Sequence, residues 1–225
     1  MHTRIFAHYT QKFFTLCAEK GFKGSMKKAV SILFSVLYKI NRLLVYELEL
    51  RKPLTPITSD IDLTYGFATF NDIKSMNKED YNYSWKGKRY SLQRLHQGDR
   101  CLLAFYGNKI VAYLWIMNGY MELSQSHHTP LPVGKTYLYK VFVVKEFRGK
   151  KILNAMHSYL FPLLYRENIR YLLTTVNVNN QSAIKAKTRS GFKEIGHIVH
   201  YRLLGFHHDY ISPNDVRALH TSRLA

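Results

Sequence analysis

Hydrophobic residues near the amino terminus recur with a helical period. Over residues 5–17 the apolar side chains are spaced by one, three and four positions, and a pair of glycines then interrupts the pattern. Ser25 is a suitable N-cap for a second segment that extends from about Met26 to Tyr46. The pattern predicts a helical hairpin, and we assign residues 1–53 to it as a separate basic, amphipathic segment.

The second predicted helix is too apolar to lie exposed in water. Its run without a charged residue, Ala29–Tyr38, has only 10 residues, whereas a membrane span needs about 20, and no signal-peptide pattern is present. Two interpretations stay open. The hairpin packs on the following domain or on a second copy, or it lies on an anionic membrane with its basic side chains toward the headgroups: Lys27, Lys28, Lys39 and Arg42. In both cases we expect a cytoplasmic protein, peripheral to the inner face of the membrane in the second.

The central part of the chain changes to the short, β-rich runs of a sheet. Residues 54–70 predict an extended segment and a strand, and two short helices should follow, one beginning near residue 71 and one over Leu92–Gln97. Two apolar runs, Cys101–Tyr106 and Ile110–Ile116, flank a Gly-Asn turn. This arrangement predicts a β-hairpin.

Strands and helices alternate in the second half of the chain. Tyr137–Val144 predicts a strand, which a basic turn joins to a helix over about Ile152–Arg166, and Tyr171–Val176 predicts the next strand. A short helix over Gln181–Ser190 and a strand over Lys193–Leu204 complete the order. Together these elements predict an α/β (α+β) fold with a mixed, mostly antiparallel sheet flanked by helices.

The composition is that of a globular protein, but the charge is unusual. Hydrophobic residues make up 46% and charged residues 21% of the 225 residues, which excludes disorder for most of the chain. The net charge of +18 is concentrated in residues 1–53 and 135–193, so we expect contact with phosphate, nucleic acid or an anionic membrane. Cys17 and Cys101 lack metal-ligand spacing, and neither a disulfide framework nor a metal is expected.

The basic turn after Tyr137–Val144 has the features of a phosphate site. Gly149 lies just ahead of the predicted helix, whose first amides have no intrahelical partners and lie at the positive end of the helix dipole. Arg148, Lys150 and Lys151 add positive charge at the same place. A solvated surface turn would have the same composition, so the turn alone leaves both interpretations open.

Two motifs together resemble the GCN5-related N-acetyltransferase (GNAT) superfamily. The first is the strand followed by the turn Glu146-Phe147-Arg148-Gly149-Lys150, and the second is Asn180 followed by Gly191-Phe192 at the family's spacing. The resemblance covers about residues 56–205. It assigns residues 54–210 to a GNAT-like acyltransferase domain and residues 211–225 to a carboxyl-terminal tail.

The resemblance implies a binding site for acetyl-CoA as the acyl donor. In the family the turn holds the pyrophosphate, and the splayed end of the preceding strand pairs with the pantetheine. We expect the backbone N–H of Phe142 or Val143 to polarise the thioester carbonyl. The residues implied for donor binding are Phe142, Val143, Val144, Arg148, Gly149, Lys150, Lys151, Ile152, Leu153, Asn180 and Lys187.

Three positions depart from the family pattern. Lys151 and Leu153 stand where the family's turn has glycine or alanine, so side chains occupy positions at which glycine lets the backbone approach phosphate. Lys151 could instead serve as a counter-ion to the pyrophosphate. Lys187 occupies the position of a tyrosine that protonates the departing thiolate, and we expect it to donate that proton or to pair with a phosphate.

The base that activates the amine is sought among polar residues near the strand ends. Glu122 is the single carboxylate between Arg100 and Lys145 in the sequence, and Tyr139 is placed on the strand that leads to the turn. We assign Glu122, Tyr139 and Lys187 as catalytic candidates. Packing or solvated roles stay open for these residues and for Tyr137, His127, His128, and the pair His207-His208 beside Asp209.

These observations favour transfer of an acetyl group from acetyl-CoA to a primary amine. If the hairpin contacts a membrane, an amino sugar in cell-envelope polysaccharide assembly is the natural acceptor. Two alternatives stay open, namely an inactive GNAT-like module that binds nucleic acid or an anionic membrane, and an aminoacyl-tRNA-dependent transferase. Nucleic acid is the less favoured partner because the sequence has no interleaved aromatic and basic platform. A homodimer is also possible.

Overall fold

The computed structural model describes residues 38–51, 57–76, 87–122, 128–203 and 206–212. The chain divides into a larger unit, Leu43–Ile198 with the residues from Ile211 onward, and a smaller unit, Met1–Arg42 with Val199–Tyr210. The candidate site lies within the larger unit. Residues 1–37 of the predicted hairpin lie outside the described residues, and this part of the hairpin stays a prediction. None of the described helices is both long enough and apolar enough to cross a membrane.

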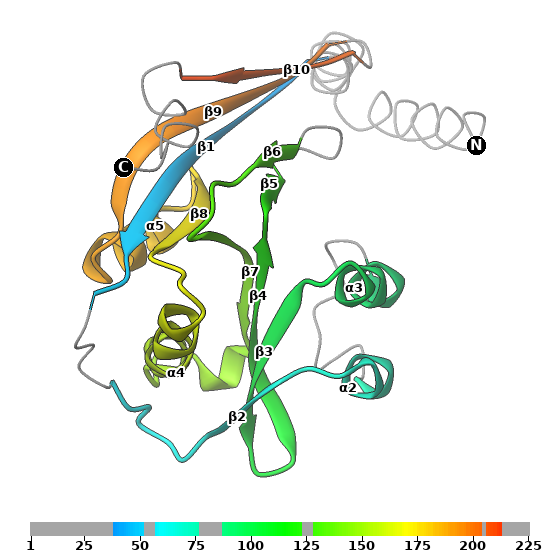
Figure 1. Ribbon diagram of the computed structural model, residues 1–225, viewed down its shortest axis with the longest axis vertical. Helices are drawn as coiled ribbons and strands as arrows, with labels where there is room; N and C mark the ends of the chain where they lie inside the picture. Colours follow the sequence, from blue (N-terminus) through cyan, green and yellow to red (C-terminus); the bar gives the residue numbers. More distant parts are fainter. Residues whose placement is uncertain (1–37, 52–56, 77–86, 123–127, 204–205, 213–225) are drawn as a thin grey trace, which may run out of the picture. The chain divides into compact units, whose positions relative to one another are not determined.

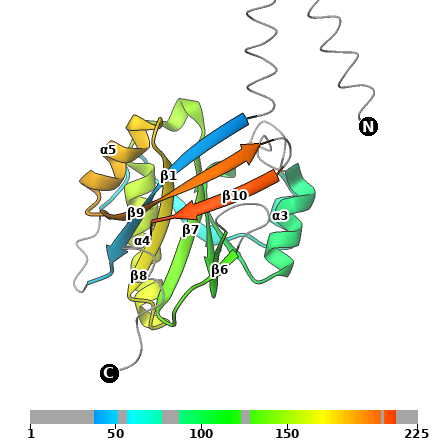
Figure 2. The same ribbon diagram turned by 90° about the horizontal axis from the view of Figure 1, so that it is seen from above.

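An eight-stranded sheet carries the site (Figure 1 and Figure 2). Its strands are β1 (Tyr38–Glu49), β2 (Thr64–Phe67), β3 (Arg100–Tyr106), β4 (Lys109–Asn118), β7 (Lys135–Val143), β8 (Tyr171–Asn177), β9 (Lys193–Leu203) and β10 (Phe206–Ile211). The order is β10-β9-β1-β8-β7-β4-β3-β2. β7 and β8 pair in parallel, whereas β1–β8, β4–β7, β3–β4 and β2–β3 are antiparallel. The predicted mixed, mostly antiparallel sheet is therefore confirmed.

Helices cover both faces of this sheet (Figure 1). They are α2 (Phe70–Ser75), α3 (Gly87–His96), α4 (Ile152–Arg166) and α5 (Gln181–Arg189), with a short 3₁₀ helix, η2 (Lys145–Phe147), before α4. Met156 of α4 shares a core cluster with Leu114 of β4, whereas Ile73 of α2 shares another cluster with Tyr113 of the same strand. Successive residues of β4 thus face opposite helix layers, and both faces of the strand are buried.

Strand β1 corrects the sequence prediction. The helix predicted from Met26 to Tyr46 is wrong over Tyr38–Tyr46, because these residues belong to β1, which pairs with β8 over Leu43–Glu49. Tyr46 and its neighbour Val45 enter different core clusters on the two faces of the sheet. Leu43–Tyr46 are apolar at every position because they pack on both faces, so their periodicity does not distinguish a strand from a buried helix.

The other predicted elements are confirmed with small shifts. Gly107 turns the hairpin between β3 and β4 with φ +56°, and α4 has the predicted bounds. β8, α5 and β9 lie within one residue of their predicted ends. α3 begins five residues earlier than predicted. The sequence pattern does not predict β10 or a small separate sheet formed by β5 (Tyr120–Glu122) and β6 (His128–Pro130).

Candidate active site

Strands β7 and β8 part halfway along their length. Residues 135–138 of β7 pair in parallel with residues 171–174 of β8. The pairing stops there within the described strands, although β7 continues to Val143 and β8 to Asn177. The carboxyl-terminal half of β7 therefore has a backbone edge that β8 does not use.

A β-bulge lies where the two strands diverge. Trp115 of β4 is opposite Lys140 of β7, and the next residue, Ile116, is opposite Leu138. Tyr139 is left as the extra residue of β7. Because a bulge bends its strand and increases the local twist, it accounts for the separation of β7 from β8.

The open edge of β7 presents backbone groups toward this gap. Val144 N donates to Val111 O at 2.9 Å, and the register of the ladder then directs the N–H and C=O of Val143 away from β4. By the same alternation, the N–H of Phe142 is directed toward β4 and that of Val141 toward the gap. Of the two amides predicted to polarise a carbonyl, the geometry favours Val143 over Phe142.

The turn after β7 leaves the first amides of α4 unbonded. Gly149 and Lys151, the N-cap of α4, have φ +83° and +55°, both in the left-handed region. Within the described residues no side chain caps α4, and the backbone amides of residues 149–154 have no acceptor. Arg148 Nε donates to Val143 O at 3.1 Å, which places its guanidinium between the turn and the open edge. Unbonded amides beside cationic side chains are what a phosphate group requires.

The segment before β2 braces this turn. The backbone N–H of Asp60 and the hydroxyl of Ser59 both donate to Lys150 O, each at 3.1 Å. The Asp60 carboxylate also pairs with Lys151 Nζ at 2.7 Å, with both side chains exposed. Lys151, predicted as a counter-ion to phosphate, thus has an internal partner. An exposed pair contributes about 0–1 kcal/mol, so a phosphate dianion can displace the carboxylate.

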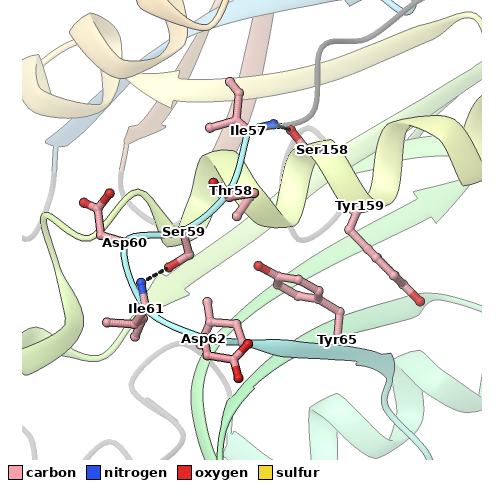
Figure 3. A pocket seen from close by; sticks show the side chains of 11 residues that line it. Ile57, Thr58, Ser59, Asp60, Ile61, Asp62, Tyr65, Ser158 and Tyr159 are labelled. Atoms are coloured by element: carbon pink, nitrogen blue, oxygen red, sulfur yellow. Dashed lines mark hydrogen bonds between the residues drawn. The ribbon is translucent and has the colours of Figure 1, made fainter.

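A pocket of about 540 Å³ is lined by the same segment and by α4 (Figure 3). The rings of Tyr65 and Tyr159 stack in it with centroids 5.1 Å apart, and Ile57 N donates to Ser158 Oγ at 2.8 Å. Its lining within the described residues includes no member of β7, β8 or α5. The pocket is therefore separate from the gap between the strands.

Helix α5 follows β8 and is fixed at both ends. The Asn180 side chain accepts a hydrogen bond from Ala183 N at 3.1 Å, as expected of an N-cap. At the other end Gly191 has φ +81°, and Phe192 N donates to Lys187 O at 3.1 Å. Both predicted caps are confirmed. They fix the last turn of α5, which carries Lys187.

Lys187 and His157 are buried polar groups that lack hydrogen-bond partners. Neither Lys187 Nζ nor His157 Nε2 has one among the described residues. The amino nitrogen lies 4.5 Å from the centroid of the Phe192 ring, and the His157 ring stacks on Phe161. Burial lowers the pKa of Lys187 to about 8. Burial and, after it, the charge of Lys187 lower the pKa of His157 to about 3, so this imidazole is neutral at pH 7.

A second group of polar side chains, some buried and some partly buried, joins α3, β5 and β7. Arg94 Nε and Tyr139 OH both donate to Asp99 Oδ2, at 2.6 and 2.9 Å, and Tyr90 OH donates to Glu122 Oε2 at 3.0 Å. Arg94 Nη1 lies 3.7 Å from Glu122 Oε2, and its guanidinium faces the rings of Tyr90 and Tyr139. We call these five residues the arginine cluster.

Two predicted catalytic residues, Glu122 and Tyr139, belong to the arginine cluster. Burial raises the pKa of Tyr139 and the nearby Asp99 carboxylate raises it further, so the phenol stays protonated. The side chain of Glu122 is only 11% exposed and is not a solvated strand end. Sequence reasoning missed Arg94 and Asp99. The turn at Gly98 between them is visible in the sequence, but no pattern indicates that both charged side chains point inward.

The remaining candidates are less well placed or lie outside the described residues. Tyr137 OH bonds Thr175 Oγ1 at 2.6 Å, and burial raises its pKa to about 12. His128 belongs to β6 and the pair His207-His208 to β10, but the structure does not describe the side chains of His127, His128, His207 and Asp209. Among the described residues no three or more His, Cys, Asp or Glu side chains are grouped as metal ligands.

The part of the chain that carries these features also matches a protein family. Residues 70–192, which are 123 of the 225 residues, match the Acetyltransferase (GNAT) family. The matched range includes β7, the turn, α4 and α5. No curated protein matches the sequence significantly.

Solved structures share the fold at low sequence identity. A functionally unknown conserved protein from Staphylococcus epidermidis has a TM-score of 0.51 and 15% identity, covering 79% of this chain and 67% of that one. A Drosophila melanogaster protein has a TM-score of 0.55 and 11% identity, with coverages of 83% and 58%. A GNAT-family acetyltransferase from Colwellia psychrerythraea has a TM-score of 0.51 and 16% identity, with coverages of 74% and 57%. This chain therefore spans less than two thirds of the last two proteins, and these likenesses concern the fold alone.

Proposed function

Because the chain belongs to the acetyltransferase (GNAT) family, we propose that it transfers an acetyl group from acetyl-CoA to a primary amine, with the donor bound along the open edge of β7. The observation that carries this proposal is the junction of two backbone surfaces that lack backbone partners among the described residues. The edge of β7 beyond Leu138 has no partner strand, and it leads directly to the unbonded amides that open α4. A pantetheine arm ending in a diphosphate has the chemistry that satisfies both.

The residues of the chain that would hold the donor fall into two groups. Backbone groups of β7, from Phe142 to Val144 with Val143 foremost, would bond the amides of the arm and the thioester carbonyl. The turn would hold the diphosphate through the amides of Gly149, Lys150, Lys151, Ile152 and Leu153, with the Arg148 guanidinium beside them. Asn180, which caps α5, stands at the end of β8 on the other side of the gap.

The donor supplies an activated acyl group. The protein has to keep the attacking amine neutral, polarise the thioester carbonyl and give a proton to the departing thiolate. We assign the proton to Lys187, because a pKa of about 8 matches that of an alkyl thiol, about 8.5. For the amine we assign Glu122, held by Tyr90 and Arg94, as the carboxylate that accepts its proton. Tyr139, a protonated phenol at the bulge, orients the amine by hydrogen bonding.

The charge of the arginine cluster supports an amine as the acceptor. Its two carboxylates, Asp99 and Glu122, face one guanidinium, that of Arg94, so the ionised cluster has a net charge of −1. A negative cluster in a chain of net charge +18 attracts a cation. An amino sugar in cell-envelope polysaccharide assembly remains our candidate acceptor, and contact of residues 1–37 with an anionic membrane remains a proposal tied to it.

Calorimetry and thiol release test the proposed function. Acetyl-CoA titrated into the full chain should bind with a micromolar Kd, and a screen of amines, amino-sugar nucleotides and peptides should identify an acceptor that releases free thiol. If acetyl-CoA does not bind while RNA, DNA or anionic vesicles do, the protein is an inactive GNAT-like module. If transfer requires an aminoacyl-tRNA, it belongs to the tRNA-dependent class. Either result would exclude the proposal.

A further inference from the structure

Resting on the proposed function, we propose that Lys187 is itself an acyl acceptor. When no amine substrate is present, its ε-amino group takes the acetyl group from bound acetyl-CoA, and the side chain becomes N-acetyllysine. This acetylation occupies the proposed acid and stops further transfer.

The role proposed for Lys187, protonation of the leaving group, places its nitrogen beside the thioester. A group that protonates the departing sulfur has to stand within hydrogen-bond reach of it. The sulfur is bonded directly to the carbonyl carbon, so the nitrogen of that group is also next to the electrophile. A tyrosine in this place is a weak nucleophile while it is protonated, whereas an unprotonated lysine is a strong one.

The nitrogen of Lys187 is enclosed by the fold, but no described side chain holds its proton. Nζ has no hydrogen-bond partner among the described residues, and its recorded contact is with the face of the Phe192 ring. The titratable group that couples to it is His157 of α4, which is neutral at pH 7. Burial alone lowers the pKa of Lys187, so no described carboxylate holds the proton on this amine.

Lys135 shows what a protected buried lysine looks like in the same protein. It is as buried as Lys187, at 8% against 9% exposure. Its Nζ, however, pairs with the Glu47 carboxylate at 2.8 Å and lies over the Tyr171 ring. An ion pair favours the ammonium form, which has no lone pair for attack. Lys187 lacks such a partner, and this difference defines the expected selectivity.

The reaction is balanced without any further reactant. The lone pair of neutral Lys187 Nζ attacks the thioester carbonyl carbon, the N–C bond forms, and the C–S bond breaks with its electron pair passing to sulfur. The proton lost from the nitrogen ends on the thiolate. The products are N-acetyllysine and coenzyme A as its thiol, and the amide is too stable to pass the acetyl group onward.

The test is acetylation of the full-length protein by acetyl-CoA without an acceptor, followed by peptide mass spectrometry. A chymotryptic peptide ending at Phe192 contains both Lys185 and Lys187. We expect the mass of one acetyl group on Lys187, accumulating about tenfold faster at pH 9 than at pH 7 because the neutral fraction rises by about that factor around a pKa of about 8. Exposed Lys185 on the same helix and paired Lys135 are the internal controls.

Three variants sharpen the result. Lys187→Arg and Lys187→Tyr should remove this acetylation, whereas Lys185→Arg should leave both the acetylation and the binding of acetyl-CoA by calorimetry unchanged. A small aryl acetate, which has no diphosphate, should favour the exposed lysines over Lys187. Binding of acetyl-CoA with no faster acetylation of Lys187 than of Lys185 would overturn the inference and leave the proposed function standing. Failure of acetyl-CoA to bind would overturn both.

Discussion

The arginine cluster differs from the donor side of the molecule, by which we mean α4 and α5 beside the open edge of β7, in whether its polar groups have hydrogen-bond partners. In the cluster, the Arg94 guanidinium is bonded to Asp99 and faces Glu122, and the phenols of Tyr90 and Tyr139 donate to those carboxylates. On the donor side, the first amides of α4, Lys187 Nζ and His157 Nε2 all lack partners among the described residues. Buried polar groups are normally satisfied within the fold. The contrast indicates that the cluster maintains its own geometry, and it supports our proposal that the donor side is completed by acetyl-CoA.

The largest expected effect comes from His157. Its pKa is 6.5 in an unfolded chain and about 3 in the fold, so between these values the unfolded state binds a proton that the folded state does not. The free energy of unfolding should therefore fall by roughly 4–5 kcal/mol as the pH drops from 6.5 to 3. The variant His157→Phe should lack this loss and should gain about 1–3 kcal/mol at pH 7, because an unsatisfied buried nitrogen is removed.

Urea denaturation at several pH values measures the effect of His157→Phe. Calorimetry of acetyl-CoA at pH 7 serves as the control for an intact donor site. An acid-induced loss in the variant as steep as in the natural protein would contradict the assignment of His157 as a group buried in its neutral form.

The variant Arg94→Met tests whether the arginine cluster maintains the fold. It leaves Asp99 and Glu122 without their buried counter-charge and should cost about 3–5 kcal/mol in the free energy of unfolding. Adding Asp99→Asn should recover part of the loss because it removes one of the stranded carboxylates. A loss of less than about 1 kcal/mol in the free energy of unfolding of Arg94→Met, as is usual for a surface substitution, would show that the cluster does not maintain the fold.

Gly149→Ala tests the donor side with less effect on stability. At φ +83° an added Cβ should cost about 1–2 kcal/mol, and the altered turn should weaken acetyl-CoA binding at least about tenfold, a change of about 1.4 kcal/mol. Gly107→Ala is a matched control, because Gly107 also has positive φ and open space around it, but it lies in the β3–β4 hairpin. Equal loss of acetyl-CoA affinity in both variants would show that the turn does not bind the donor.

The smallest effect is expected from Asp60→Asn. The exposed pair between Asp60 and Lys151 should contribute below about 1 kcal/mol to stability. Releasing Lys151 and removing a carboxylate beside the turn should tighten acetyl-CoA binding by a few-fold at low salt. The gain should shrink at high salt through screening, and Asp62→Asn provides the neighbouring control. Weaker binding of acetyl-CoA in Asp60→Asn would mean that the pair between Asp60 and Lys151 supports the turn more than the charge of Asp60 repels the donor.

Local sequence signals predicted the elements whose ends they mark. Asn180 and the Gly191-Phe192 pair bound α5 correctly, and Gly149 with its basic neighbours indicated the helix opening that the structure leaves unbonded. β1 was not predictable in the same way, because its segment Leu43–Tyr46 packs on both faces of the sheet and forms an apolar run that also fits a helix.

The arginine cluster also could not be predicted from local signals. Arg94, Asp99 and Glu122 meet only after α3, β5 and β7 have packed, and charged residues are mostly exposed. The divergence of β7 from β8 likewise depends on a bulge set by the register with β4, for which Tyr139 carries no recognisable signal. Long-range packing therefore decides both features.

Strand β1 has a consequence for how the enzyme can be divided. The range that matches the family begins at residue 70, yet Leu43–Glu49 of β1 cover the edge of β8 that faces away from β7. A protein shortened to residues 70–192 would expose that edge of β8, and an exposed strand edge can pair with strands of other chains. The acetyltransferase fold therefore depends on a strand that lies upstream of the family range. Any sequence that replaced Leu43–Glu49 would have to supply another strand that covers this edge of β8 and keeps the sheet from aggregating.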